Sequence, residues 1–243
     1  MTWTTQEIDG KKADIFTPED VEPQPFVILH LHGHSEQTLK DNAAYSSALE
    51  QRGLRCVCPH GKRSWWLDQI CSEYDPEISP QSYLLNSLVP WIEDEWNVSP
   101  PAIGLTGISM GGQGALQLAY RHARKFPVVA ALAPAVDFYH WHGRELPIDE
   151  MFKSPEAARQ ASVILHLHPL SWPRHQFLAC DPADEEWFDS ADKLSMKLSS
   201  SGIPHELDFE TTNGGHTWEY FESMAEKMIG WTHEQLQSVA RSI

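Results

Sequence analysis

Gly107-Ile108-Ser109-Met110-Gly111-Gly112 is the stretch that decides the fold. An apolar, strand-like run over residues 102–106 precedes it, and an Ala- and Leu-rich, helix-like run over residues 114–120 follows it. The chain must therefore turn sharply between strand and helix, with Ser109 at the apex. Glycines on both sides of the serine lack the β-carbons that would collide in so tight a turn. Gly-x-Ser-x-Gly occurs by chance in roughly one chain in fifteen of this length, but this context makes it a candidate nucleophile elbow.

A serine hydroxyl becomes an effective nucleophile only when a histidine takes its proton and an acid orients that histidine. His216 stands directly after Asn213-Gly214-Gly215, in a loop between a strand-like run over residues 205–210 and a C-terminal helix. Flexible glycines in that loop let an imidazole swing over the sheet toward Ser109. We therefore expect His216 to be the general base.

The acid should lie between the serine and the histidine in the chain. The strand-like run over residues 175–180 ends in Asp181-Pro182-Ala183-Asp184, which places two carboxylates at its carboxyl end. Nucleophile, acid and base then follow the chain order of an α/β-hydrolase. Asp181 has a structural alternative, because Asp before Pro commonly opens a turn. Asp184 has one too, as the cap of a helix that begins near Glu185.

The negative charge of a tetrahedral intermediate needs two backbone N–H donors. Met110, the residue after the serine, would supply one of them. The other usually comes from the loop after an early strand, and here the apolar run over residues 25–31 is followed by His32-Gly33-His34-Ser35. We assign the second donor to the backbone of His34, with Ser35 as the near alternative.

Three alternating histidines, His30, His32 and His34, raise the possibility of a metal site, because alternate residues of a strand share a face and neutral imidazoles bind zinc. Their spacing departs from the Asp-containing H-x-H-x-D-H pattern, and the oxyanion interpretation also explains Gly33. We therefore predict no metal and no cofactor. The favoured interpretation makes His30 and His32 hydrogen-bonded residues at a strand end that shape the pocket.

Strand-like and helix-like runs alternate along the 243 residues, a pattern that predicts one α/β domain, 1–243, with a mostly parallel sheet and helices on both faces. The strands are expected near residues 26–32, 54–58, 102–107, 127–133, 175–180 and 205–210, with a further one near 5–16. The helices are expected near residues 41–52, 81–96, 110–124, 154–164, 188–200 and 217–239. Pro90 should kink the second of these helices. The irregular segment 134–173 is a candidate lid or pocket wall.

Several motifs together resemble the group of α/β-hydrolase esterases that includes esterase D, S-formylglutathione hydrolase and feruloyl esterases, and the resemblance covers most of the chain. The motifs are His32-Gly33, Pro59-His60-Gly61 with Ser64-Trp65-Trp66, Leu88-Val89-Pro90-Trp91-Ile92-Glu93 before Trp96-Asn97-Val98, Gly107 to Gly112, and His216-Thr217-Trp218. The chain is also similar to the phospholipase and carboxylesterase branch. Both resemblances imply an α/β-hydrolase fold with a serine esterase triad and do not specify a substrate.

Two departures from this family pattern affect what the resemblance implies. Many relatives of esterase D have His where this chain has Ile108, so a glutathione thioester is not implied as the substrate. The acid loop of the family commonly reads Gly-x-x-Asp, and here Asp181 occupies the glycine position while Asp184 falls on the acid. That register favours Asp184 as the acid of the triad.

Aromatic residues in two loops are candidates for substrate binding. Trp65 and Trp66 are adjacent in a polar loop, where they are hard to bury together, so we expect one of them to line the site. Trp141 lies in the aromatic and histidine-rich segment 137–143, which could form the floor for an acyl or aryl group. The alternative is that these rings only close the core.

Composition excludes several other classes of protein. With 18 basic and 34 acidic residues the formal charge is −16, which argues against nucleic acid or an anionic membrane as a partner. No apolar run approaches the roughly twenty residues that span a bilayer. The first residues lack the features of a secretory signal, so a cytoplasmic location is expected. The four cysteines show no metal-ligand spacing, and only Cys71 lies in a polar loop where its thiol could be exposed.

These observations predict a serine carboxylesterase that cleaves a small or medium soluble ester through an acyl-enzyme, with Ser109, His216 and Asp184 as its triad. An acyltransferase, thioesterase or peptidase using the same triad remains an alternative, because fold and triad do not choose the acceptor or the leaving group. A non-catalytic binding protein with this fold is the third hypothesis.

Overall fold

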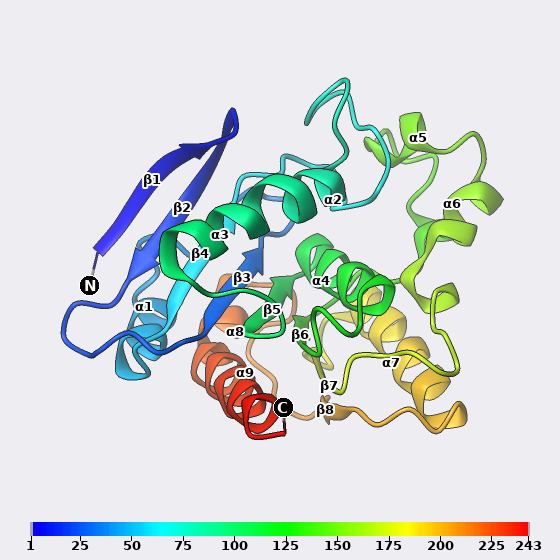
Figure 1. The fold of residues 1–243 in the computed structure, drawn as a ribbon. Coiled ribbons are helices and arrows are strands. Elements are labelled where there is room, and N and C mark those ends of the chain that lie inside the picture. The colour runs from blue at the N-terminus through cyan, green and yellow to red at the C-terminus, as the bar shows by residue number, and fades with distance from the viewer. Residues whose placement is uncertain (1, 243) are drawn as a thin grey trace.

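Buried apolar runs form the centre of an eight-stranded sheet in the computed structural model, which describes residues 2–242 (Figure 1). The strand order is β1-β2-β4-β3-β5-β6-β7-β8, and every pair from β4 to β8 is parallel. The strands are β1 (Thr2–Ile8), β2 (Lys11–Thr17), β3 (Val27–Leu31), β4 (Arg55–Pro59), β5 (Ile103–Ile108), β6 (Val128–Leu132), β7 (His175–Ala179) and β8 (Glu206–Asp208). The predicted mostly parallel α/β sheet is confirmed.

The register of the parallel strands brings their carboxyl ends to one edge of the sheet. Leu31 of β3 pairs with Gly107 of β5, and Ile108 pairs with Leu132 of β6. Leu132 in turn pairs with Ala179, the last residue of β7. Loops that leave these four strands therefore meet at the same edge, which is where open α/β sheets bind their ligands.

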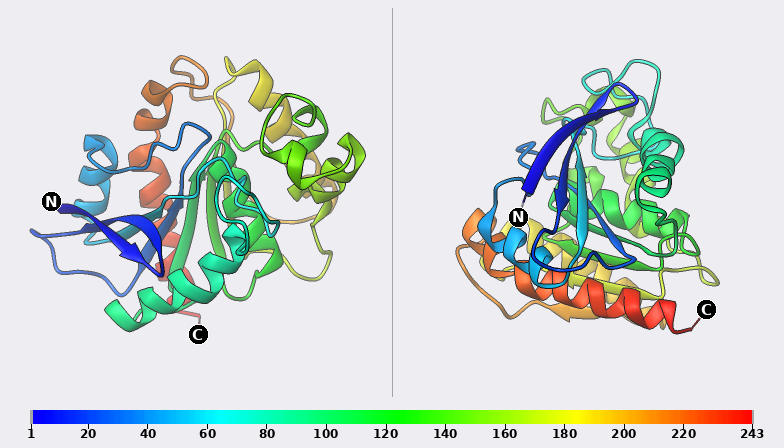
Figure 2. Two further views of the ribbon diagram at one scale, coloured as in Figure 1. Left: turned by 90° about the horizontal axis from the view of Figure 1, so that it is seen from above. Right: turned by 60° about the vertical axis from the view of Figure 1, so that its left-hand side comes forward.

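Helices cover both faces of the sheet, with α1 and α9 on one side and α3 and α4 on the other (Figure 2). The alternation of β3 shows this directly, because Leu29 and Leu31 pack in one core cluster and Ile28 packs in the other. The helices are α1 (Ala43–Gln51), α2 (Pro80–Tyr83), α3 (Val89–Trp96), α4 (Met110–Arg121), α5 (Ile148–Met151), α6 (Pro155–Ala161), α7 (Glu185–Ser200), α8 (Trp218–Ser223) and α9 (Ala225–Ala240).

Two elements differ from the sequence-based expectation. The single strand expected near residues 5–16 is a hairpin of β1 and β2, which reverses at Asp9 and Gly10, both with positive φ. The helix expected over 81–96 contains a π-helical turn, η1 (Leu84–Leu88), and Pro90 is the second residue of α3, which follows that turn. In that turn Val89 N–H donates to the carbonyl of Leu84. Because Pro90 has no N–H to continue the usual ladder, the widened turn accommodates it without ending the helix.

The segment 134–173 contains four short helical pieces, two of which fall where the helix near residues 154–164 is expected. They are η2 (Phe138–His140), α5, α6 and η3 (Val163–Leu165). In Figure 1 this part of the chain forms the right-hand side of the molecule, next to the carboxyl end of the sheet.

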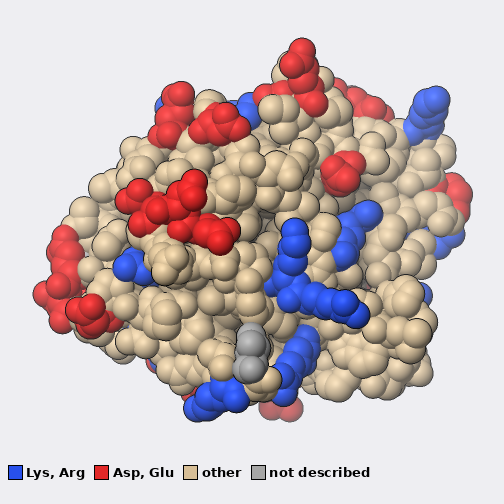
Figure 3. All heavy atoms as spheres, viewed as in Figure 1, with Lys and Arg blue, Asp and Glu red and all other residues tan. Residues whose placement is uncertain are grey.

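The four cysteines are free and buried, including Cys71, so its thiol is less accessible than its polar loop suggested. Cys56 and Cys58 lie on the same face of β4, with their sulfur atoms 3.7 Å apart. Among the described helices, none has both the length and the apolar character that crossing a bilayer requires. Figure 3 shows that charge is unevenly spread over one face, with acidic side chains grouped over α3 and along the rim and basic ones gathered near the lower centre.

Candidate active site

Ser109 occupies a strained turn between β5 and α4. Its backbone has φ 58° and ψ −121°, a conformation that few residues other than glycine adopt. A β-carbon on Gly107 would overlap the carbonyl of Gly111, and one on Gly111 would overlap the carbonyl of Leu31. The two glycines therefore let the turn close against itself and against β3, as a nucleophile elbow requires.

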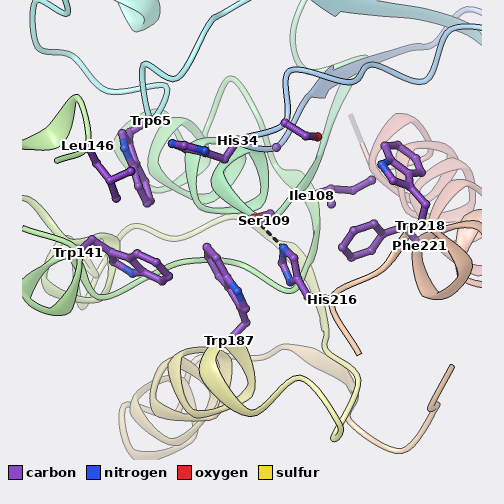
Figure 4. A pocket seen from close by; sticks show the side chains of 12 residues that line it. His34, Trp65, Ile108, Ser109, Trp141, Leu146, Trp187, His216, Trp218 and Phe221 are labelled. Carbon is purple, nitrogen blue, oxygen red and sulfur yellow. Dashed lines mark hydrogen bonds between the residues drawn. The ribbon is translucent and has the colours of Figure 1, made fainter. Parts of the chain in front are cut away.

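A continuous chain of hydrogen bonds links Ser109 to His216 and Asp184, as the dashed line to the serine in Figure 4 partly shows. The distance from Ser109 Oγ to His216 Nε2 is 3.1 Å, and that from His216 Nδ1 to Asp184 Oδ2 is 2.6 Å. With the serine donating to Nε2, the imidazole carries its proton on Nδ1 and donates it to the carboxylate. The structure thus brings together three residues that the sequence separates by 107 and 32 positions.

Asp184 uses its two carboxylate oxygens for different contacts. Oδ2 accepts the hydrogen bond from His216, and Oδ1 accepts a longer one, 3.4 Å, from the backbone N–H of Trp187. Asp184 is therefore both the N-cap of α7 and the hydrogen-bond partner of the His216 imidazole. The helix N-terminus adds a favourable dipole for its negative charge.

Asp181 binds the loop that carries His216 instead of the imidazole itself. Its Oδ2 accepts the backbone N–H groups of Asn213 at 2.6 Å and Gly215 at 2.8 Å, and its Oδ1 accepts that of Ala183 at 2.7 Å. Burial alone would raise the pKa of this carboxyl, but these three donors stabilise its charged form and hold the pKa below its ordinary value. Asp181 thereby ties the histidine loop to the end of β7.

The two backbone groups expected to form an oxyanion hole belong to the residue after the serine and to the loop after β3. Met110 is the first residue of α4, so its N–H has no partner within the helix. The loop after β3 is in contact with the elbow, because a β-carbon on Gly33 would lie 3.3 Å from Cβ of Ser109. This contact brings His34, the next residue, to the rim of the same pocket.

His30 and His32 are buried and hydrogen-bonded within the sheet edge. His32 Nε2 accepts the N–H of Gly61 at 2.9 Å, so its Nδ1 carries the proton and donates to the carbonyl of Gly33 at 2.7 Å. Burial lowers the pKa of His32 to about 4 and that of His30 to about 3, so both rings are neutral at pH 7. His30 contacts Thr106 through Nδ1. Within residues 2–242, no group of three or more His, Cys, Asp or Glu side chains is arranged to hold a metal ion.

An apolar pocket of about 330 Å³ opens at Ser109 and His216 (Figure 4). Its aromatic and aliphatic walls are Trp65, Ile108, Trp141, Leu146, Trp187, Trp218 and Phe221. Gly33, His34 and Ser35 complete the lining, which contains no Lys, Arg, Asp or Glu among the described residues. Trp65 and Trp141, two of the candidate substrate-binding residues, therefore line the cavity.

Trp66 does not line the pocket, against one of our candidate assignments. Both Trp65 and Trp66 are buried and have positive φ, but of the two only Trp65 lines the pocket. The Trp66 ring packs where β-carbons on Gly61 and Gly114 would stand, and its Nε1–H donates to the carbonyl of His32 at 3.0 Å. Trp66 thus supports the loop beneath the site.

The pocket lining also includes residues that were not among our candidates, among them Leu146, Trp187, Trp218 and Phe221. Trp187 and Phe221 contact the imidazole of His216 directly, with ring centroids 4.6 Å and 5.2 Å away. The positions of Trp187 and Phe221 in the sequence could have indicated that they belong to the site. Trp187 follows Asp184 by one helical turn, and Phe221 follows His216 at the start of the next helix, so each was close in sequence to a predicted site residue.

Comparisons with known proteins agree with this architecture. The sequence profile of the family described as "Putative esterase" matches residues 12–231. An S-formylglutathione hydrolase from Agrobacterium tumefaciens superposes with a TM-score of 0.78 at 16% identity, covering 96% of this chain and 94% of its own. A fluorophosphonate-binding serine hydrolase from Staphylococcus aureus superposes with a TM-score of 0.75 at 17% identity, covering 95% of this chain and 97% of its own. A ferulic acid esterase superposes with a TM-score of 0.74 at 17% identity, covering 96% of this chain and 97% of its own. At such identities these structures show that the fold is that of the α/β-hydrolases.

Proposed function

The chain belongs to the Putative esterase family and is a carboxylesterase-type hydrolase, and we propose that it cleaves small or medium carboxylic esters through Ser109, His216 and Asp184. The observation that carries the proposal is the unbroken hydrogen-bond chain from the serine hydroxyl through both imidazole nitrogens to the carboxylate. The strained φ of Ser109 supports it, because such strain is typical of a nucleophile elbow.

The first half of the reaction makes an acyl-enzyme. Ser109 Oγ attacks the ester carbonyl while its proton passes to His216 Nε2, and the imidazolium is held by Asp184. The carbonyl oxygen becomes an oxyanion, for which the N–H groups of Met110 and His34 are the proposed donors. The intermediate collapses when the bond to the alcohol breaks and His216 returns its proton to the departing oxygen.

The second half releases the acid by the same steps with water in place of serine. His216 takes a proton from the water, whose oxygen attacks the acyl carbon, and the bond to Ser109 Oγ then breaks. His216 gives the proton back to the serine, so the enzyme returns to its starting state. Neither half needs a metal or a cofactor.

The pocket supports an uncharged, largely apolar ester as the substrate. Its aromatic and aliphatic walls favour acyl or alcohol groups of the same character. Among the described residues that line it, there is no Lys, Arg, Asp or Glu to pair with a charged group. Trp141 and Leu146 come from the segment 134–173, which supports its role as a pocket wall. A glutathione thioester carries several charges and fits this lining less well.

Hydrolysis of a graded series of p-nitrophenyl esters, with S109A as the matched control, tests the proposal. We expect turnover that depends on acyl length in the wild type and disappears in the variant. Labelling of Ser109 by a fluorophosphonate is measured in parallel. Labelling without turnover of any ester would overturn the substrate class but keep the triad, and an alcohol-rich assay that yields a new ester would point to acyl transfer. The absence of both labelling and turnover would overturn the mechanism.

A further inference from the structure

The imidazole of His216 is held between two aromatic rings that belong to different helices. Trp187 of α7 is stacked on its face, with ring centroids 4.6 Å apart and planes inclined by 17°. Phe221 of α8 meets it edge-on, at 5.2 Å and 89°. In Figure 4 the two rings lie on opposite sides of the imidazole. A tilt of the histidine ring out of its plane would therefore lose contact with Trp187 or collide with Phe221.

Trp187 is itself held in place by a second stacked ring. The centroid of Trp141 lies 4.6 Å from that of Trp187, with planes inclined by 28°, and Figure 4 shows Trp187 between Trp141 and His216. Trp141 also contacts Trp65 at 5.9 Å. The indole that covers the histidine is thus one layer of a stack that extends from α7 to the pocket wall.

The backbone of Trp187 contacts the other partner of the histidine. Its N–H donates to Oδ1 of Asp184, whose Oδ2 accepts the bond from His216 Nδ1. One residue therefore touches both the acid, through its backbone, and the base, through its ring. This double contact is what separates Trp187 from the other aromatic residues of the pocket.

The proposed reaction changes the charge of the histidine on which Trp187 is stacked. His216 is neutral before the attack and becomes an imidazolium as the tetrahedral intermediate forms. The face of an indole carries negative charge and attracts a cation stacked on it. The loop that carries His216 contains Gly214 and Gly215, both with positive φ, so its backbone provides little steric restraint of its own.

We propose that Trp187 is a positioning residue of this hydrolase, whose ring holds His216 in line with Ser109 and Asp184 and stabilises its charged form during the reaction. The inference rests on the proposed function, because it concerns the same histidine. The elements packed around His216 are the acid loop, α7 and α8, and their charged groups are Asp181, Asp184, Glu185, Glu186, Asp189, Asp192, Lys193, Lys197, Glu219 and Glu222. His34 lines the same pocket, and Arg144 lies over the Trp141 ring. All of these groups are retained in the variants of Trp187 below. A change in the acid limb of the pH profile of kcat/KM can therefore be attributed to the loss of the indole ring.

Steady-state kinetics of W187L and W187F on p-nitrophenyl esters, measured from pH 5 to 9, test the inference. We expect W187L to lower kcat by about ten-fold with KM within about two-fold, and to move the acid limb of kcat/KM to lower pH by about half a unit. W187F keeps a smaller ring and should recover most of kcat. Trp218 lines the same pocket and contacts Phe221 instead of the imidazole, so W218L should change KM and leave the acid limb in place.

The rate at which a fluorophosphonate labels Ser109 provides a second readout that needs no ester. Labelling of W187L at the wild-type rate, with a superimposed pH profile and only KM raised, would show that Trp187 is merely a wall of the pocket. If W187L does not fold, W187F carries the comparison, because its weaker ring should give a smaller change in the same direction. A wild type that neither labels nor hydrolyses would instead overturn the proposed function, and this inference with it.

Discussion

Oδ2 of Asp181 accepts a hydrogen bond of 2.8 Å from the backbone N–H of Gly215, the residue immediately before His216. The same oxygen accepts the N–H of Asn213, so a buried carboxylate closes the base of the histidine loop. Two acidic residues three positions apart thus have separate tasks. Asp184 is hydrogen-bonded to the imidazole, whereas Asp181 is hydrogen-bonded to the backbone of the loop that carries it.

The two carboxylates should therefore respond differently to the same substitution. D184N replaces the acceptor of the His216 Nδ1 proton, and we expect kcat to fall by about a thousand-fold or more with the fold intact. D181N removes the charge that three backbone donors stabilise, so we expect a lower melting temperature and a fall in kcat of about ten-fold. Kinetics and thermal melts of both variants check this. Equal losses of kcat in well-folded proteins would contradict the division of roles.

Adjacent tryptophans provide a second comparison. Trp65 lines the pocket, so W65L should raise KM for apolar esters by several-fold while the melting temperature changes less. Trp66 is fully buried beneath the loop and donates to the His32 carbonyl, so W66L should lower the free energy of unfolding by roughly 3–5 kcal/mol. Urea unfolding and steady-state kinetics on the two variants separate these effects. A W66L protein of normal stability with an altered KM would show that the assignment is reversed.

The buried histidines predict how stability depends on pH. Their pKa values are lowered from 6.5 to about 3 in His30 and about 4 in His32, because burial disfavours the charged ring. The unfolded chain therefore binds protons first, so their contribution is complete above pH 6.5 and is lost as pH falls from there toward 4. Within this window, each histidine should lower the free energy of unfolding by roughly 1.4 kcal/mol for every unit by which the pH falls.

Urea unfolding at pH 7.5, 6 and 5 measures this loss. The carboxyl groups with lowered pKa values change the stability only at more acidic pH, because the pKa values of Asp14 and Asp208 are lowered from 3.8 to about 2. H32N is the matched control, because its side chain stays neutral throughout. It should be less stable at pH 7.5 and lose stability less steeply between pH 6 and 5. An unchanged slope would mean that His32 does not titrate on unfolding as described.

The sequence predicts the parts of this molecule that depend on local pattern. Strand hydrophobicity, the glycines around Ser109 and the order of serine, acid and histidine are all local, and they were sufficient for the sheet and for the residues that meet at its edge. The stack of Trp141, Trp187 and His216 joins three segments far apart in the chain, so no local pattern could indicate it. The positive φ of two successive tryptophans, Trp65 and Trp66, and the burial of both rings are equally invisible in the sequence.

Gly111 and Gly112 test the elbow itself. A β-carbon at Gly111 would overlap the carbonyl oxygen of Leu31, which is main chain of β3 and cannot move without separating α4 from the sheet. A β-carbon at Gly112 would meet the carbonyl oxygens of Leu132 and Gly107 at 3.1 Å and 3.2 Å, a contact that a shift of a few tenths of an ångström relieves. We therefore expect G111A to be recovered misfolded or with a melting temperature lowered by more than 10 °C, and G112A to fold with a smaller loss. Circular dichroism melts of the pair measure the difference, and a G111A protein as stable and as readily labelled at Ser109 as G112A would show that the turn is looser than this packing implies.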